Sequence, residues 1–259
     1  MPRGLGLIIY GIEGIGKTTF CLQAPKPLSI MPIREPGYFD LEDVGEVPQG
    51  VTPLIVKDYE DVKVAISACQ AKTLVIDSIS GLQEFLVKYI TNTVYGGSFK
   101  AFKSFYNGLR QDCPREVAEI IDLLEFIRNK GTNVLICAHR QTATEDDPSG
   151  PDIRVQTLFG DIGVTGPFMK WAQATLFLAG KKQVDIVTKS VGFGGQSKVL
   201  EGKATAGVSR LMYTQFSGSH VAKNKLHLPP VIAMGKSAEE SWSNFCKALP
   251  ESIQKNLQS

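Results

Sequence analysis

The stretch GIEGIGKTT, which begins at Gly11, combines glycines with a lysine and two threonines. It follows the apolar run 5–10 and opens a segment in which apolar residues have helical spacing. Glycines let backbone N–H groups turn toward a polyphosphate, and the N-terminus of a helix adds partial positive charge. Lys17 would then reach the β and γ phosphates, and the hydroxyl of Thr18 would hold Mg²⁺. The expected phosphate-binding residues are Gly11, Glu13, Gly14, Ile15, Gly16, Lys17, Thr18 and Thr19.

A magnesium ion at Thr18 also needs a carboxylate, and the stretch TLVIDS offers Asp77 at the end of an apolar run. This run, residues 73–76, has the continuous hydrophobicity of a strand that is buried on both faces. The loop and the aspartate together predict a site for ATP and Mg²⁺, with Thr18 and Asp77 as the metal ligands. Two alternatives stay open: a chance match in a glycine turn, and an aspartate that only caps the next helix.

Alternating strand and helix patterns would position these residues. Such alternation is typical of a parallel sheet flanked by helices, and it predicts an α/β fold. The segment 32–50, which is rich in proline and acidic residues, is expected to be a loop. Strands are expected at 5–10, 28–31, 51–56, 73–76 and 133–138, and helices at 17–23, at 62–69, after a cap at Ser80, and between Pro114 and Gly131.

The C-terminal part of the chain has a different pattern. Residues 172–179, 184–189 and 208–214 are expected to form strands joined by glycine-rich turns, as in an antiparallel meander. Ser237 and Glu240 have the spacing of a capping box, so an amphipathic helix packed on the core is expected to follow.

Bulk composition excludes little by itself. The net charge of +2 gives no overall sign of a protein that binds nucleic acid or membranes. The five cysteines lack CxxC spacing, which argues against a zinc cluster or a disulfide framework. The N-terminal apolar stretch is too short for a signal peptide, and no apolar run approaches the roughly 20 residues of a membrane-spanning helix. A cytoplasmic protein without a membrane partner is expected.

Four segments together carry a resemblance to a known family: LIIYGIEGIGKTTFCLQAPKPL, TLVIDSISGL, NVLICAHRQ and AKNKLHLPPVI. In this order they resemble the RecA-like ATPases of bacteriophages and prophages, some of which act in recombination or single-strand annealing. The resemblance covers most of residues 5–233. It implies a RecA-like ATPase domain over residues 1–236, with a C-terminal helix or tail over 237–259. It also implies slow or partner-stimulated ATP hydrolysis.

The resemblance further suggests roles for single residues. In RecA-like proteins a glutamate after the second strand activates the attacking water, which points to Glu35, with Glu42 as the second choice. His139 takes the place of a polar sensor of the γ-phosphate, and a histidine can donate a hydrogen bond to a phosphate oxygen. A side chain that merely caps the end of its strand is the alternative for His139.

RecA-like ATPases usually receive a basic residue from a neighbouring subunit, so a homo-oligomer is implied. Arg210, Lys223 and Lys225 are the candidates, and a solvated basic face is the alternative.

Two segments correspond to the loops that face DNA in this family, which makes single-stranded DNA or a single-strand-binding protein the expected partner. Aromatic residues for stacking and cations for phosphates lie in the first. They are Phe99, Phe102, Phe105 and Tyr106 together with Lys100, Lys103 and Arg110. The same spacing also suits a helical stripe that faces the core. The second segment, 140–160, reads as a mobile polar loop whose acids would repel phosphates. A nucleotide-dependent switch or assembly protein without DNA binding is therefore the alternative function.

Overall fold

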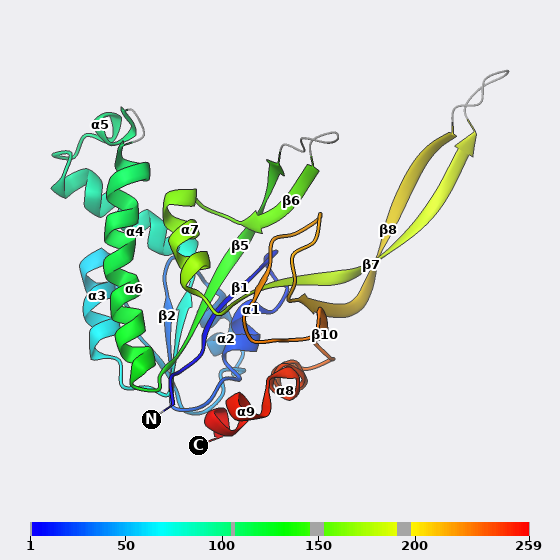
Figure 1. Ribbon diagram of the computed structural model, residues 1–259, viewed down its shortest axis with the longest axis horizontal. Helices are drawn as coiled ribbons and strands as arrows, with labels where there is room; N and C mark the ends of the chain where they lie inside the picture. The colour runs from blue at the N-terminus through cyan, green and yellow to red at the C-terminus, as the bar shows by residue number, and fades with distance from the viewer. Residues whose placement is uncertain (1, 105–106, 146–152, 191–197, 259) are drawn as a thin grey trace.

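The computed structural model describes residues 2–104, 107–145, 153–190 and 198–258, and for residues 181–208 the backbone alone is considered. One mixed sheet of ten strands crosses these residues, in the order β10-β8-β7-β1-β5-β4-β2-β3, with β6 beside β5 and β9 beside β7 (Figure 1). The strands are β1 (Gly6–Gly11), β2 (Leu28–Pro32), β3 (Val51–Pro53), β4 (Thr73–Asp77), β5 (Asn133–Glu145), β6 (Ile153–Leu158), β7 (Ala174–Ser190), β8 (Lys198–Tyr213), β9 (Lys223–Asn224) and β10 (Val231–Ala233).

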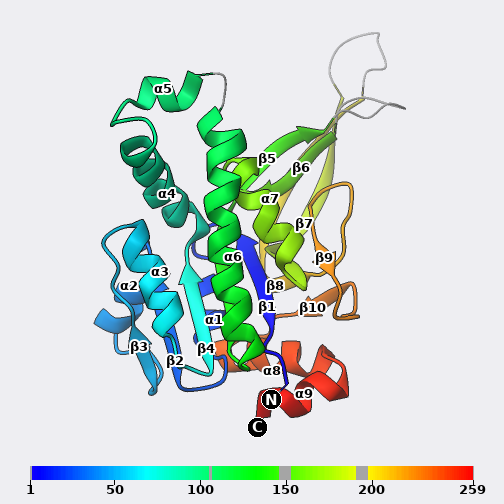
Figure 2. The same cartoon turned by 60° about the vertical axis from the view of Figure 1, so that its left-hand side comes forward.

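Helices cover both faces of this sheet (Figure 2). One face carries α3, α4, α6 and α7, and the other carries α1 and α8. The helices are α1 (Lys17–Cys21), α2 (Gly37–Asp43), α3 (Tyr59–Ala68), α4 (Ile79–Thr93), α5 (Phe99–Lys103), α6 (Cys113–Asn129), α7 (Ile162–Trp171), α8 (Ala238–Ala248) and α9 (Glu251–Gln258), with a π-helical turn, η2 (Gly108–Asp112).

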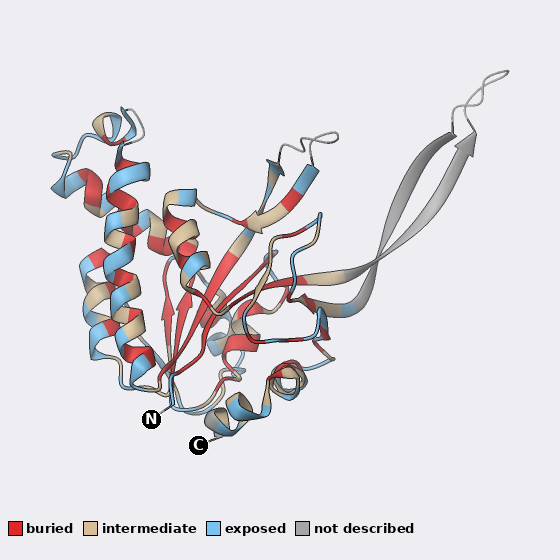
Figure 3. Cartoon of the chain, in the orientation of Figure 1, coloured by how far each residue is buried: buried red, intermediate tan, exposed pale blue. Residues whose placement is uncertain are grey.

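The two hydrophobic cores follow from the alternation of side chains along the central strands. In β1, Ile8 and Tyr10 face the core under α6, whereas Leu7 and Ile9 face the core under α1. Because both faces are covered, the central strands are buried along their length, as Figure 3 shows in red. This explains why the sequence of these strands is continuously apolar.

The expected α/β class, with a mostly parallel central sheet flanked by helices, is confirmed. Strands β3, β2, β4, β5, β1 and β7 form the parallel part of the sheet, and β8 and β10 are antiparallel at one edge. Strand β5 lies between β1 and β4, and it pairs Gly11 with His139 and Asp77 with Cys137. The carboxyl ends of β1 and β4 therefore lie at one edge of the sheet, with His139 of β5 between them, and the site is built there.

Several local expectations were wrong. The segment 32–50 contains a helix, α2, because Tyr38 is buried in the core and anchors it. The segment 140–160 is not a simple loop: β5 continues to Glu145 and pairs with β6. Residues 146–152 of this segment lie outside the described part of the chain.

Corrections also apply to two other elements. The expected strands 172–179 and 184–189 are parts of one strand, β7, whose first half is parallel to β1, so the meander begins only at β8. The cap of α4 is Ser78 rather than Ser80, since the Ser78 hydroxyl accepts the Gly81 amide at 3.4 Å.

The C-terminal segment forms two helices at the bottom of the molecule (Figure 1). The Ser237 hydroxyl accepts the Glu240 amide at 3.1 Å, so the predicted cap of α8 is confirmed. The rings of Trp242 and Phe245 lie 5.2 and 5.7 Å from Phe20 of α1. Helix α8 thus packs against α1, the helix that follows the phosphate-binding loop, and a division of the chain at residue 236 stays a prediction. In the described part of the chain, no helix is both long and apolar enough to cross a membrane.

Arg128 of α6 is a fully buried cation at the amino end of the sheet. Its guanidinium donates to the Gly4 carbonyl at 3.0 Å and to Gln173 Oε1 at 2.9 Å, and it pairs with Glu125 at 3.2 Å. A Cβ at Gly6 would lie 2.8 Å from the guanidinium carbon, so β1 can lie this close to Arg128 only because residue 6 is glycine. One side chain therefore ties α6, β1 and the start of β7 together.

An Arg128→Ala substitution is expected to lower the free energy of unfolding by about 3–5 kcal/mol, because it leaves buried acceptors without a donor. Urea denaturation followed by circular dichroism measures this loss. Arg115→Ala is the matched control on the same helix, since the side chain of Arg115 is 62% exposed and its pair with Asp112 is worth less than about 1 kcal/mol. Equal losses in the two variants would contradict the assigned role of Arg128.

Candidate nucleotide-binding site

The predicted phosphate-binding loop follows β1 and ends at the start of α1. A Cβ at Gly11 would lie 2.6 Å from the Leu178 carbonyl oxygen of β7, so the neighbouring strand excludes any side chain there. Gly14 and Gly16 have φ angles of 69° and 98°, which favour glycine. The loop can therefore curl with its amides toward a common point, as phosphate binding needs.

Lys17 is a buried cation at the first position of α1. Its ammonium donates to the carbonyl oxygens of Ile12 at 3.0 Å and Gly11 at 3.4 Å. Both carbonyls belong to the phosphate-binding loop, so the positive charge of Lys17 is held inside the loop, where phosphates would lie.

Thr18 and Asp77 meet at the sheet edge, as the sequence predicts. The Thr18 hydroxyl donates to Asp77 Oδ2 at 2.6 Å. Asp77 is 3% exposed, and burial raises the pKa of its carboxyl, although the hydrogen bond from Thr18 opposes the shift. A hydroxyl and a carboxylate are the hard oxygen donors that Mg²⁺ prefers, and a buried carboxylate gains a partner when the ion binds. The residues fit a magnesium ion.

Glu35 and His139 also come together in the same place. His139 Nε2 lies 2.8 Å from Glu35 Oε1, and the Ser78 hydroxyl donates to the same oxygen at 2.7 Å. Burial by itself would raise the pKa of Glu35, but these two hydrogen bonds and the positive charges of His139 and Lys17 outweigh it, so the pKa is lowered. Glu35 is therefore an ionised carboxylate beside the phosphate-binding loop.

A cleft of about 630 Å³ joins these groups. Of the predicted residues, Gly11 and Ile15 do not line it, and the Ile15 side chain is buried in the core. Glu42 does not line it either, because its carboxylate accepts the Tyr38 hydroxyl at 2.9 Å. The cleft is lined by Glu13, Gly14, Gly16, Lys17, Thr18, Thr19, Arg34, Glu35, Pro36, Gly37, Asp40, Leu41, Asp77 and His139.

Sequence reasoning missed the part of the lining that comes from residues 34–41, apart from Glu35, and it missed Ser78 beside Glu35. Arg34 has a φ angle of 58°, which is uncommon for a residue with a side chain. A Cβ at Gly37 would lie 3.1 Å from Thr18 Oγ1, so α2 begins close to the Thr18 hydroxyl. Ser78 directly follows Asp77, and this adjacency was the one signal in the sequence that could have identified it.

Two of the basic candidates contact their own chain. Arg210 reaches the phosphate-binding loop of the same chain, where it donates to the Ile15 carbonyl at 3.4 Å, and its expected action on a neighbouring subunit stays a prediction. The Lys223 ammonium donates to the carbonyls of Met169 and Lys170 at 2.8 and 2.6 Å, at the C-terminal end of α7. Lys225 is exposed.

A second hollow, of about 740 Å³, lies between α4, α5 and the segment that follows β6. We call it the aromatic groove; it is lined by Gln83, Glu84, Val87, Lys88, Thr91, Asn92, Phe99, Phe102, Lys103, Leu109, Gln141, Phe159, Gly160 and Asp161. Phe102 is buried, as the core alternative requires, whereas Phe99 is 49% exposed. The Lys103 ammonium lies 4.5 Å from the centre of the Phe99 ring. Phe105 and Tyr106 lie outside the described residues.

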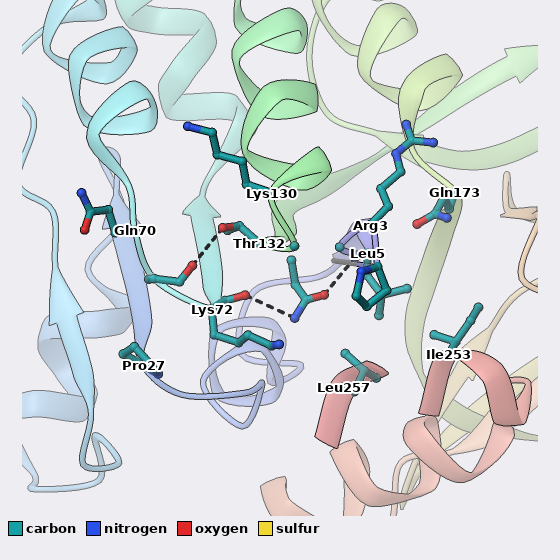
Figure 4. Close-up of a pocket in the computed structure, with 15 residues that line it drawn as sticks. Arg3, Leu5, Pro27, Gln70, Lys72, Lys130, Thr132, Gln173, Ile253 and Leu257 are labelled. Carbon is teal, nitrogen blue, oxygen red and sulfur yellow. Dashed lines mark hydrogen bonds between the residues drawn. The ribbon is translucent and has the colours of Figure 1, made fainter. Parts of the chain in front are cut away.

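A third hollow, of about 480 Å³, opens at the opposite edge of the sheet (Figure 4). Its buried polar side chains are already engaged: Asn133 accepts the Leu5 amide at 2.9 Å, and the Thr132 hydroxyl donates to the Ala71 carbonyl at 3.0 Å. The groups that suit phosphate chemistry are gathered at the other edge instead.

Comparison with known proteins was made for the whole chain. The sequence model of the AAA domain family matches residues 3–226. No curated protein matches the chain. Among solved structures, the flagellar accessory protein FlaH from Methanocaldococcus jannaschii is similar at 12% sequence identity and a TM-score of 0.40, with 90% of this chain and 85% of that chain covered. The family match spans the phosphate-binding loop, Asp77 and His139.

An Asp77→Asn substitution is expected to raise the Tm of the nucleotide-free and metal-free protein by about 2–4 °C at pH 7, which corresponds to about 1 kcal/mol. Burial raises the pKa of Asp77, so the folded protein at neutral pH carries a disfavoured charge that asparagine removes. The gain is expected to shrink as pH falls and to vanish below about 3.9, the ordinary pKa of aspartate, where the wild-type carboxyl becomes protonated in both states.

Scanning calorimetry in EDTA at several pH values measures this difference. The control is Asp40→Asn, which removes an exposed carboxylate from the same cleft and is expected to leave Tm unchanged. A lower Tm for Asp77→Asn at pH 7 would show that the charge stabilises the empty site.

Proposed function

Because the chain belongs to the AAA domain family of P-loop ATPases, we propose that it binds Mg-ATP and hydrolyses it slowly, in phage-type DNA recombination or single-strand annealing. The convergence of Lys17, the Thr18–Asp77 pair and Glu35 on one cleft is the observation that carries the ATPase part. The DNA part rests on the aromatic groove and on the family resemblance.

In this proposal the loop amides and Lys17 bind the phosphates, and Thr18 and Asp77 hold Mg²⁺. The ion, when bound, would neutralise charge on the phosphate oxygens. Lys17 is already held inside the loop by the Ile12 and Gly11 carbonyls, so little reorganisation is needed for it to turn toward a phosphate.

Glu35 is the proposed base for the attacking water, with His139 as the sensor of the γ-phosphate. Its lowered pKa keeps Glu35 ionised at neutral pH, as a base must be. The same oxygen of Glu35 accepts hydrogen bonds from Ser78 and His139, which weakens its basicity. Slow turnover in the absence of a partner is the expected consequence.

The aromatic groove supports a single-stranded nucleic acid as partner. Phe99 offers an exposed ring face next to the Lys103 cation, which suits base stacking and phosphate contact. The Thr91 hydroxyl lines the groove, is buried and finds no hydrogen-bond partner in the described part of the chain. Gln141, two residues after His139 on β5, also lines the groove, so the proposed strand would lie close to the ATP site.

A homo-oligomer belongs to the same proposal. Arg210 and Lys223 are engaged within their own chain, which leaves the exposed Lys225 as the candidate to complete a neighbouring site.

The second candidate function is a nucleotide-dependent switch or assembly protein that does not bind DNA. The carboxylates of Glu84 and Asp161 favour it, because they line the aromatic groove and would repel phosphates.

A Glu35→Gln substitution is expected to lower kcat for ATP hydrolysis by about 10²–10⁴-fold, because glutamine cannot accept the proton of the attacking water. ATP affinity is expected to stay within about threefold, since Glu35 is not a phosphate ligand in the proposal. Steady-state phosphate release and binding of a fluorescent ATP analogue measure the two quantities.

Two further variants make this result decisive. Glu42→Gln changes the other candidate carboxylate, which lies outside the cleft, and is expected to keep kcat. Lys17→Ala is expected to lose ATP binding as well as turnover. Hydrolysis that survives in Glu35→Gln and fails in Glu42→Gln would reverse the assignment of the base.

A Phe99→Ala substitution is expected to weaken binding of single-stranded DNA by about 5- to 150-fold, because stacking of one base on an aromatic ring contributes about 1–3 kcal/mol. Fluorescence anisotropy with labelled oligonucleotide, with and without ATP, measures this loss. Phe126→Ala is the matched control: Phe126 is 52% exposed, has the Lys130 ammonium 3.9 Å from its ring, and lies outside the groove.

Binding that weakens with added salt would support the DNA role. Wild-type protein that hydrolyses ATP but binds no DNA at low salt would leave the switch function as the better proposal.

A further inference from the structure

Arg210 lies behind the phosphate-binding loop of its own chain. It pairs with Gly180 in the β7–β8 ladder, and β7 pairs in turn with β1, which leads into the loop. Its Nη1 is 3.4 Å from the Ile15 carbonyl oxygen and would be 2.6 Å from a Cβ at Gly16. The guanidinium therefore sits against the Ile15–Gly16 peptide.

This contact lies outside the cleft. Gly16 lines the cleft, whereas Arg210 and Ile15 do not. The Ile15 side chain is buried in the core, and Arg210 meets the Ile15 carbonyl away from the cleft, since neither residue lines it. Arg210 thus contacts the loop from behind.

The geometry of the Ile15–Gly16 peptide links the position of its carbonyl, which contacts Arg210, to the direction of the Gly16 N–H. The Ile15–Gly16 bond is not among the cis bonds of the described chain, and in a trans peptide the C=O and the N–H point in opposite directions. A donor that holds the Ile15 carbonyl on the protein side therefore turns the Gly16 N–H away from Arg210. A cation on the carbonyl also polarises the peptide and makes its N–H a stronger donor.

The position of Arg210 is itself fixed. Its carbonyl accepts the Met234 amide at 3.0 Å from the segment after β10, and its side chain is only partly exposed. The left-handed φ of 98° at Gly16 favours glycine, and a Cβ there would lie 2.6 Å from Arg210 Nη1 and would displace the guanidinium. The absence of a side chain at Gly16 therefore lets the Arg210 guanidinium lie against the loop backbone.

We propose that Arg210 is a positioning residue of the ATP site, which orients the Ile15–Gly16 peptide so that the Gly16 amide is presented to a nucleotide phosphate. The inference rests on nucleotide binding by the P-loop and is independent of any role in DNA recombination. It assigns Arg210 to the site of its own chain.

An Arg210→Gln substitution is expected to raise KM for ATP, and Kd for ADP, by about tenfold and to leave kcat within about twofold. An amide that contacts a phosphate equally in the bound substrate and in the transition state contributes to binding and not to the chemical step. Arg210→Lys, which keeps a cationic donor, is expected to recover part of the loss.

The control is Arg115→Gln, which removes an exposed arginine far in sequence from the loop and should change neither constant. Circular dichroism and Tm of the nucleotide-free variants show whether they fold. Unchanged KM in Arg210→Gln, or a fall in kcat at constant KM, would overturn the inference. Wild-type protein that binds no ATP would overturn the proposed function instead, and the two failures are therefore distinguishable.

Discussion

The parallel register of β1, β5 and β4 is the constraint on which the rest of the site depends. It pairs Gly11 with His139 and Asp77 with Cys137, so β1 and β4 end at the same edge of the sheet, on either side of His139 in β5. Open α/β sheets bind ligands at the carboxyl ends of their strands because the connecting loops leave a crevice there. A shift in this register would separate Thr18 from Asp77, since their hydrogen bond spans only 2.6 Å.

Neighbouring elements shape the loop as much as its own residues do. The backbone of β7 approaches Gly11 so closely that a side chain is excluded, and the Arg210 guanidinium lies against Gly16. On the other side, α2 begins against Thr18 at Gly37. The phosphate-binding loop is therefore held from three directions before any nucleotide binds, which reduces the reorganisation that binding would require.

Glu35 connects the nucleotide cleft to the aromatic groove through its two hydrogen-bond partners. Ser78 caps α4, which carries Gln83 into the groove, and His139 lies on β5, which carries Gln141 there. Within the groove, the backbone amide of Asp161 donates a hydrogen bond to Gln83 Oε1 at 2.8 Å. This bond links α4 to the segment that follows β6. The two elements that carry Gln83 and Gln141 into the groove, α4 and β5, therefore also carry the hydrogen-bond partners of the proposed base.

Features encoded within a few consecutive residues could be predicted from the sequence. The apolar run before Asp77 and the glycines before Lys17 specify a buried strand and a helix start locally. Helix α2 was missed because prolines and acids surround it, and it is kept by the burial of Tyr38 in a core that only the folded chain forms. The pairing of β5 with β6 was missed because the paired segments are mostly polar, with only Val155 and Leu158 of β6 buried.

The sequence by itself determined the fold class, the phosphate-binding loop and the chemical types gathered for it: a lysine, a hydroxyl and carboxylates. The tertiary structure decided which of them meet: Thr18 with Asp77, and Glu35 with His139 and Ser78, while Glu42 turns to Tyr38. It also placed Arg210 behind the loop of its own chain. Hydrogen bonds act over about 3 Å and depend on angle, so partners from distant segments are specified only when packing has fixed every backbone between them.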